Sequence, residues 1–286
     1  MSLLPNFVII GAMKSGTTSL YDSLRISSGF FLPDNKEPNL LHRATSVDDC
    51  RKAYQRHFRG AGDGMILGEA STIYTMMPWF PDLSKRARDV CGSELRLIMI
   101  MRDPIDRIVS HLRHDYLTGR LSTADFDVQV LAEQRFVAIS DYATQLEPWV
   151  KTFGADRLLC VDFEKFRCAP GAQLERVAAF LGCDPRGMAS TLPWSNSHDA
   201  LLAPRIRGVI NLAGSGAYFN GLRRALPSSV RRLAKQALFQ RREVVEVALS
   251  ASTIERLEAQ LRSVRRRLFD LTGFSLSERL ISQEEI

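Results

Sequence analysis

The sequence lacks long apolar runs, paired cysteines and a targeting segment. Its longest apolar runs, residues 7–13 and 95–101, have the length of a strand and are far too short to span a bilayer. The N-terminus has no basic start followed by an apolar core, so no secretory signal is expected. The five cysteines are scattered and form no Cys-x-x-Cys pair, which argues against a zinc site and a disulfide framework. These absences predict a soluble chain with reduced thiols in the cytoplasm.

Acidic residues are missing from one long stretch. The net charge is +6, but between Ala200 and Arg242 there is no Asp or Glu at all, while arginines are frequent. The basic segment 205–242 would suit a polyanion, a nucleotide phosphate or peripheral contact with the inner membrane surface. A solvated helical face is the alternative. A nucleic-acid partner is not expected, because the sequence holds no recognised binding module.

The segment from Phe7 to Leu20 carries the strongest local signal. A β-branched apolar run ends in a loop rich in glycine and hydroxyls, and an amphipathic segment follows, which predicts a strand, a tight turn and a helix N-terminus. Such a turn suits a phosphate, and Lys14 adds a positive charge there. The common nucleotide P-loop places Gly-Lys before Ser or Thr, whereas Lys14 here precedes Gly16. An ordinary strand-to-helix turn with a solvated lysine is the alternative. The hydroxyl donors of this loop are Ser15, Thr17, Thr18 and Ser19.

A second motif follows the apolar run 95–101. Arg102 ends this predicted strand, Asp103 is a plausible N-cap, and Pro104 suits the first turn of a helix. Ser110 falls about two turns into that helix. Doubly wound sheets bind ligands at the carboxyl ends of their strands, and an arginine offers a planar fork of donors to a phosphate there. A surface pair between Arg102 and Asp103 is the alternative.

Together the two motifs resemble the sulfotransferases that use 3′-phosphoadenosine 5′-phosphosulfate (PAPS). The pattern is Lys-Ser-Gly-Thr-Thr at residues 14–18, then Arg-Asp-Pro-x-x-Arg-x-x-Ser at residues 102–110. Lys36-Glu37-Pro38 is similar to an element of the heparan-sulfate and other carbohydrate sulfotransferases, and residues 68–74, 141–149 and 180–182 also match. The resemblance covers residues 7–183. The resemblance weakens after residue 183, so the sequence does not identify the segment that closes over the adenine.

The resemblance implies a role for each candidate residue. The loop from Lys14 to Ser19 would hold the 5′-phosphosulfate, with Lys14 stabilising the leaving phosphate, and no metal is implied. Arg102 and Ser110 would hold the 3′-phosphate. Glu37 would remove the proton from a hydroxyl or amine acceptor, and Lys36 would lie beside the sulfuryl group.

Two other residues compete with Glu37 for the base. His42 is one, because other branches of the family use histidine. Glu69, after a predicted strand, could face the cleft and either position the substrate or take part in catalysis. The Lys36-Glu37 element favours a carbohydrate or glycolipid acceptor.

The order of elements predicts an α/β fold: a P-loop-like parallel sheet flanked by helices on both faces, with a helical C-terminal third. At 286 residues we expect one sulfotransferase domain, with a PAPS-binding core at 7–183 and a lid loop and helices at 184–286. The apolar stripe from Ile254 to Leu271 predicts one long helix, packed on the body or pairing in a coiled coil, so the oligomeric state stays open. Strands are expected at 7–10, 65–67, 95–101 and 158–161. Helices are expected at 17–26, 83–90, 105–116, 126–139, 142–153 and 172–181.

Two other classes of function remain to be distinguished. A kinase-like enzyme would use ATP and Mg²⁺, and sensitivity to chelators would reveal it. A non-catalytic module would bind a polyanion or a membrane through the basic segment 205–242. Substitution of Glu37 would not weaken that binding.

Overall fold

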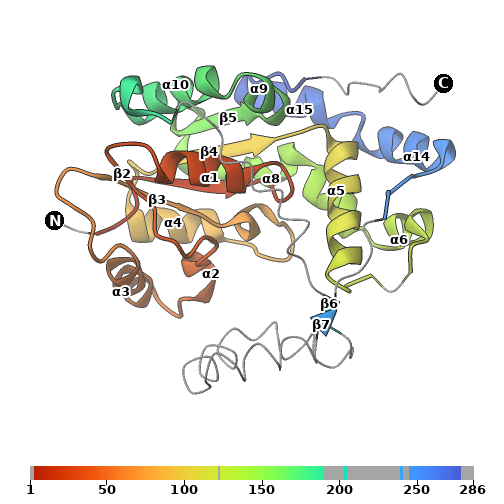
Figure 1. Ribbon diagram of the computed structural model, residues 1–286, viewed down its shortest axis with the longest axis horizontal. Coiled ribbons are helices and arrows are strands. Elements are labelled where there is room, and N and C mark those ends of the chain that lie inside the picture. The colour runs from red at the N-terminus through yellow and green to blue at the C-terminus, as the bar shows by residue number, and fades with distance from the viewer. Residues whose placement is uncertain (1–2, 122, 190–202, 205–238, 241–244, 278–286) are drawn as a thin grey trace. The chain divides into compact units, whose positions relative to one another are not determined.

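A five-stranded parallel sheet forms the centre of the fold (Figure 1). The strand order is β2-β3-β1-β4-β5, and every neighbouring pair is parallel. The computed structural model describes residues 3–121, 123–189, 203–204, 239–240 and 245–277. The strands are β1 (Phe7–Gly11), β2 (Phe30–Phe31), β3 (Ile66–Ala70), β4 (Arg96–Met101) and β5 (Leu158–Asp162).

Helices cover both faces of this sheet, as the sequence predicts (Figure 1). Phe7, Ile9, Ile98 and Ile100 pack against apolar residues of α1 and α10 in one buried cluster. The strands are buried on both faces, which explains why they read as continuous apolar runs rather than as alternating ones. The helices that precede β4 are α1 (Thr17–Arg25), α2 (Leu40–Arg43), α3 (Val47–His57), the short 3₁₀ turn η1 (Thr72–Thr75) and α4 (Leu83–Cys91).

The other helices within the described residues follow β4 along the chain. They are α5 (Pro104–Leu117), α6 (Phe126–Ala132), α7 (Arg135–Ser140), α8 (Tyr142–Phe153), η2 (Ala155–Arg157), α9 (Phe163–Cys168), α10 (Pro170–Leu181), η3 (Pro185–Gly187), α14 (Ala251–Leu261) and α15 (Val264–Thr272). A two-residue antiparallel pair, β6 (Ala203–Pro204) with β7 (Phe239–Gln240), lies outside the central sheet.

Two helices were predicted to be continuous, and both predictions were wrong. The predicted helix 126–139 is divided into α6 and α7, because Glu133 takes an extended conformation that ends α6. The predicted helix 254–271 is divided into α14 and α15 near Ser263. Ion pairs of Arg265 with Asp103 and of Arg267 with Asp141 fix α15 in place, and α15 packs against α8. The apolar period alone would have continued through both boundaries.

The contacts of the chain group into two compact units. One unit comprises Met1–Ile108, Gln134–Ser195 and Glu255–Ile286, and it holds the five-stranded sheet. The other comprises Val109–Glu133 and Asn196–Ile254. The predicted lid loop and the basic segment 205–242 lie outside the described residues, apart from β6 and β7. No helix in the described part of the chain has both the length and the apolar character needed to cross a membrane.

Candidate active site

The loop after β1 brings the N-terminus of α1 to the carboxyl edge of the sheet. Lys14 has a φ of 66° and Gly16 a φ of 85°, and these two left-handed residues turn the chain from the strand into the helix. The N-cap residue of α1 is Gly16, which has no side chain with which to cap the helix. The first turn of a helix leaves backbone N–H groups without partners inside the helix, so this end of α1 offers donors to an anion. A Cβ at Gly16 would lie 2.6 Å from the ring of Phe163, so only glycine fits.

Lys36 connects this helix end with Glu37. Its Nζ atom lies 2.9 Å from Glu37 Oε1 and 3.4 Å from Thr17 Oγ1. The segment before it is tied to α1, because the hydroxyl of Tyr21 donates a hydrogen bond to the carbonyl of Pro33. The structure therefore brings together two elements that the sequence places apart, the loop of residues 14–19 and the Lys36-Glu37 pair.

Thr72 holds the carboxylate of Glu37 from the other side. Its backbone N–H donates to Oε2 at 3.1 Å, and its hydroxyl reaches both carboxylate oxygens at 3.1 and 3.2 Å. Glu37 itself has a left-handed φ of 61°, and its backbone N–H donates to the carbonyl of Ala70. Sequence reasoning missed Thr72, although its position directly after β3, among residues that match the family, was a usable signal.

Arg102 lies at the end of β4 beside α9. Its guanidinium carbon is 5.1 Å from the ring centre of Phe163, and its Nε is buried without a hydrogen-bond partner in the described structure. The nearest carboxylate is that of Asp106, with an N–O distance of 3.7 Å. The buried hydroxyl of Tyr142 donates to the Arg102 carbonyl and fixes the backbone there. A half-buried arginine with an unsatisfied donor is a suitable anion ligand.

Asp103 does not form the surface pair with Arg102 that was the alternative. Its Oδ1 accepts the backbone N–H groups of Ile105 and Asp106, which confirms its role as the cap of α5. Its Oδ2 accepts a hydrogen bond of 2.7 Å from Arg265. Both carboxylate oxygens of Asp103 are therefore occupied by protein donors.

Two of the remaining predicted residues lie on helices beyond this cluster. His42 is exposed on α2, where its ring meets the edge of Phe80 with centres 4.7 Å apart. Ser110 is half-buried in the second turn of α5. Arg107, within the second motif, is fully buried and donates to Ser140 Oγ and to the Phe136 carbonyl, so it anchors α7 against α5.

Glu69 does not face a cleft. It is fully buried in β3 and accepts hydrogen bonds from the hydroxyls of Tyr54, Tyr74 and Ser71 at 2.7, 2.9 and 3.2 Å. Burial is the largest effect on this carboxyl, and together with the negative charge of Glu37 it raises the pKa of Glu69 to about 7, against the lowering effect of the three hydrogen bonds. A carboxyl so enclosed acts on the surrounding protein rather than on a substrate.

Comparison with known proteins identifies the family. The family model described as the sulfotransferase domain matches residues 4–193. This chain belongs to the sulfotransferase domain family. The match covers the loop of residues 14–19, the Lys36-Glu37 pair and Arg102, and so spans the candidate site just described. Within the described residues, no three His, Cys, Asp or Glu side chains gather as a set of metal ligands.

The curated relatives of this chain include two human proteins that are named for heparan sulfate. Heparan sulfate glucosamine 3-O-sulfotransferase 3B1 of Homo sapiens is 30% identical over 192 residues, which cover 63% of this chain and 46% of the relative. Bifunctional heparan sulfate N-deacetylase/N-sulfotransferase 2 of Homo sapiens is 23% identical over 202 residues, which cover 64% of this chain and 22% of the relative. The chain thus matches at most about half the length of these curated relatives.

A solved structure has the same fold. The sulfotransferase from Alicyclobacillus acidocaldarius superposes with a TM-score of 0.67 at 20% sequence identity, covering 96% of this chain and 97% of the other. The predicted α/β class with a P-loop-like parallel sheet is confirmed.

Proposed function

We propose that this chain is an enzyme that transfers a sulfuryl group from PAPS to a hydroxyl or amine of a carbohydrate, glycolipid or related acceptor. The observation that carries the proposal is the position of Lys36. Its ammonium lies between the first turn of α1, at Thr17, and the carboxylate of Glu37. A cation at this point serves both an anionic donor held by the helix and an acceptor that gives its proton to the carboxylate.

The residues at the sheet edge fit the two phosphate groups of PAPS. The uncapped N-terminus of α1, with Lys14 before it, would hold the 5′-phosphosulfate. Arg102, whose buried Nε lacks a partner in the described structure, would hold the 3′-phosphate together with Ser110. When bound, PAPS supplies the sulfuryl group and a phosphate leaving group.

Glu37 is the proposed general base. Thr72 and Lys36 fix its carboxylate with three donor groups, so its orientation is set before an acceptor arrives. The proton of the acceptor oxygen or nitrogen passes to Glu37 while Lys36 and Lys14 stabilise the negative charge that develops on the transferred and leaving oxygens. His42 is the alternative base. Its ring packs against Phe80, and this position also suits contact with the acceptor rather than proton removal.

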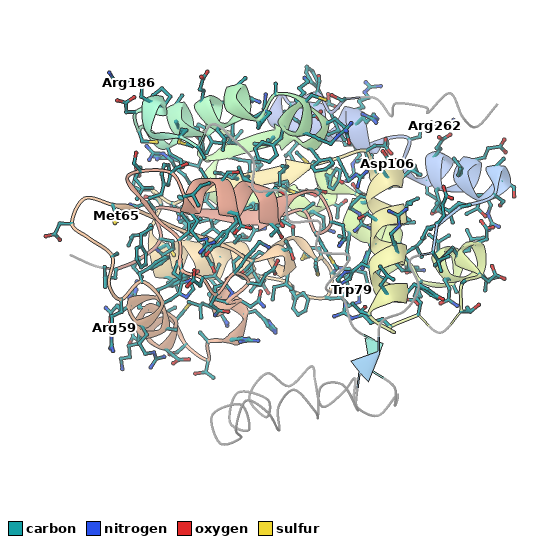
Figure 2. The ribbon with its side chains drawn as sticks, in the orientation of Figure 1. Arg59, Met65, Trp79, Asp106, Arg186 and Arg262 are labelled. Carbon is teal, nitrogen blue, oxygen red and sulfur yellow. The ribbon has the colours of Figure 1, made fainter. Side chains whose placement is uncertain are left out.

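A carbohydrate acceptor is supported by the relatives, which are named for heparan sulfate. Trp79 adds a physical reason, because its side chain is 48% exposed and it follows η1 by four residues, next to Phe80 (Figure 2). An exposed indole offers an apolar face on which a sugar ring can stack. Trp149 is fully buried and cannot serve in this way.

The alternative of an ATP- and Mg²⁺-dependent kinase is less well supported. A kinase of this kind needs a carboxylate at a strand end to hold magnesium. Asp103 follows β4, but its two oxygens already accept backbone N–H groups and the Arg265 guanidinium. A metal ion there would have to displace the cap of α5.

The test is calorimetric binding of adenosine 3′,5′-bisphosphate without metal, with ATP–Mg²⁺ as the comparison. We expect metal-free binding that Arg102→Ala weakens by about 10²-fold, because a charge-assisted contact to a phosphate contributes about 2–3 kcal/mol. Arg59→Ala is the matched control, since Arg59 lies beside α3 and is exposed (Figure 2). Labelled PAPS is then offered with heparosan fragments, simple glycosides and phenols. A preference for ATP–Mg²⁺, or an unchanged affinity for adenosine 3′,5′-bisphosphate in Arg102→Ala, would refute the proposal.

A further inference from the structure

The fully buried carboxyl of Glu69 lies on β3. The next residue of that strand, Ala70, accepts a hydrogen bond from the backbone N–H of the proposed base Glu37. Glu69 Oε1 accepts hydrogen bonds from the hydroxyls of Tyr54 and Tyr74, and Oε2 accepts one from Ser71. The residue is 0% exposed, so neither a substrate nor solvent reaches it. Its function must therefore be transmitted through these three hydroxyl groups.

Two of the three hydroxyls also hold the segment that follows Glu37. The backbone N–H of Asn39 donates to Ser71 Oγ at 3.1 Å, and the backbone N–H of Leu41 donates to Tyr74 Oη at 3.1 Å. A hydroxyl has one proton to donate. When that proton points to Glu69, the lone pairs of the hydroxyl are free to accept a backbone N–H. Above about pH 7, where Glu69 is ionised, the carboxylate thus orients both hydroxyls as acceptors for the backbone N–H groups of residues 39 and 41.

This segment needs such support because its backbone is unfavourable. Glu37 and Asn39 both have left-handed φ values, 61° and 56°. This backbone conformation is strained for Glu37, less so for Asn39, and it persists only where surrounding contacts enforce it. The contacts that enforce it come from the segment 69–74, since Thr72 of that segment also binds the Glu37 carboxylate.

We infer that Glu69 is a positioning residue that fixes the proposed base Glu37 through two relays, Ser71 to Asn39 and Tyr74 to Leu41. The inference rests on the proposed function, because it assigns the consequence to proton removal by Glu37. Tyr54 also donates to Glu69, but within the described part of the chain it forms no hydrogen bond to residues 39–41, so it offers an internal control.

The kinetic test compares four variants with wild type at pH 8, where Glu69 is ionised. Glu69→Gln, Ser71→Ala and Tyr74→Phe should lower kcat by about tenfold, the effect of a base misplaced by a fraction of an ångström. KM for PAPS and the affinity for adenosine 3′,5′-bisphosphate should change less than about twofold, because the relays do not touch the phosphate ligands. Tyr54→Phe removes a hydrogen bond of the same kind from Glu69 but leaves both relays, so its kcat should stay within about twofold of wild type.

A second measurement needs no activity. Backbone amide exchange at Asn39 and Leu41, followed by NMR, should accelerate at both positions in Glu69→Gln and at neither in Tyr54→Phe. The inference is overturned if folded Glu69→Gln keeps wild-type exchange and kcat, or if Tyr54→Phe lowers kcat as much as Tyr74→Phe. A wild-type chain that binds adenosine bisphosphate but transfers no sulfuryl group would instead refute the proposed function, and the exchange data would still decide whether Glu69 holds the segment.

Discussion

The ammonium of Lys36 lies 3.4 Å from the hydroxyl of Thr17, although 19 residues separate them in the chain. The same ammonium forms an ion pair of 2.9 Å with Glu37, and its side chain is only 17% exposed. A partly buried cation shared between a helix N-terminus and a carboxylate is a position where charge can be stabilised during a reaction. This single side chain links the loop of residues 14–19 with the Lys36-Glu37 pair, and the proposed function depends on both.

Replacement of Lys36 should therefore affect the chemical step. Lys36→Met keeps the length of the side chain and removes its charge, and we expect kcat to fall by about 10²-fold or more, since the developing charge loses its fixed donor. Lys85→Met is the matched control, because Lys85 is 77% exposed on α4 and pairs only with Asp82 among the contacts described. Steady-state kinetics with labelled PAPS measures both. Equal kcat values for the two variants would contradict the role of Lys36.

Removal of the proposed base should leave nucleotide binding intact. Glu37→Gln keeps the shape of the side chain and its bonds to Thr72, but it cannot take a proton. We expect kcat to fall by about 10²- to 10⁴-fold, while the affinity for adenosine 3′,5′-bisphosphate stays within about threefold. Glu147→Gln, an exposed position on α8, controls for the loss of a carboxylate. If His42→Ala abolishes transfer and Glu37→Gln does not, histidine is the base.

Gly16 should tolerate no side chain. Gly16→Ala places a Cβ 2.6 Å from the Phe163 ring at a φ of 85°, so the cost of the left-handed backbone and that of the collision combine. Gly64→Ala is a precise comparison, because Gly64 has a φ of 78° and nothing within 4 Å of its Cβ. We expect a loss of about 1 kcal/mol in unfolding free energy for Gly64→Ala and at least about 2 kcal/mol for Gly16→Ala.

The displaced Phe163 should also weaken nucleotide binding in Gly16→Ala, because Arg102 stacks over its ring. Urea unfolding and calorimetry of both variants check these expectations. Equal stability of the two variants would show that the ring moves aside without cost.

The stability of the fold should depend on pH through Glu69. The folded protein holds the proton of this carboxyl up to about pH 7, whereas the unfolded chain releases it near the usual value of 4.5. Between these values the folded state binds more protons, so its stability decreases as pH rises. Urea unfolding at pH 5 and pH 8 should show a decrease that is larger in wild type than in Glu69→Gln, by on the order of 2–3 kcal/mol. Equal pH dependence of the two proteins would contradict the raised pKa.

Most of the sheet could be predicted from the sequence. Four of the five strands in the central sheet appear as apolar runs of strand length, and Asp103 and Pro104 marked the start of α5 correctly, because capping depends on local backbone geometry. The short strand β2 was missed, since two residues carry no period. The division near Ser263 was missed because the apolar stripe continues across it, and the ion pairs that hold α15 involve residues far away in the sequence.

The candidate site divides in the same way. The sequence determined the two motifs that are proposed to bind phosphate, the glycine that the turn requires and the Lys36-Glu37 pair, because each is a property of residues close together in the chain. Only the tertiary structure decided that Thr72 holds Glu37, that Phe163 lies under Arg102 and that Glu69 is fully buried. The carboxyl ends of parallel strands bring these residues together, and hydrogen bonds across 30 or more positions depend on how the chain folds back, which no local pattern records.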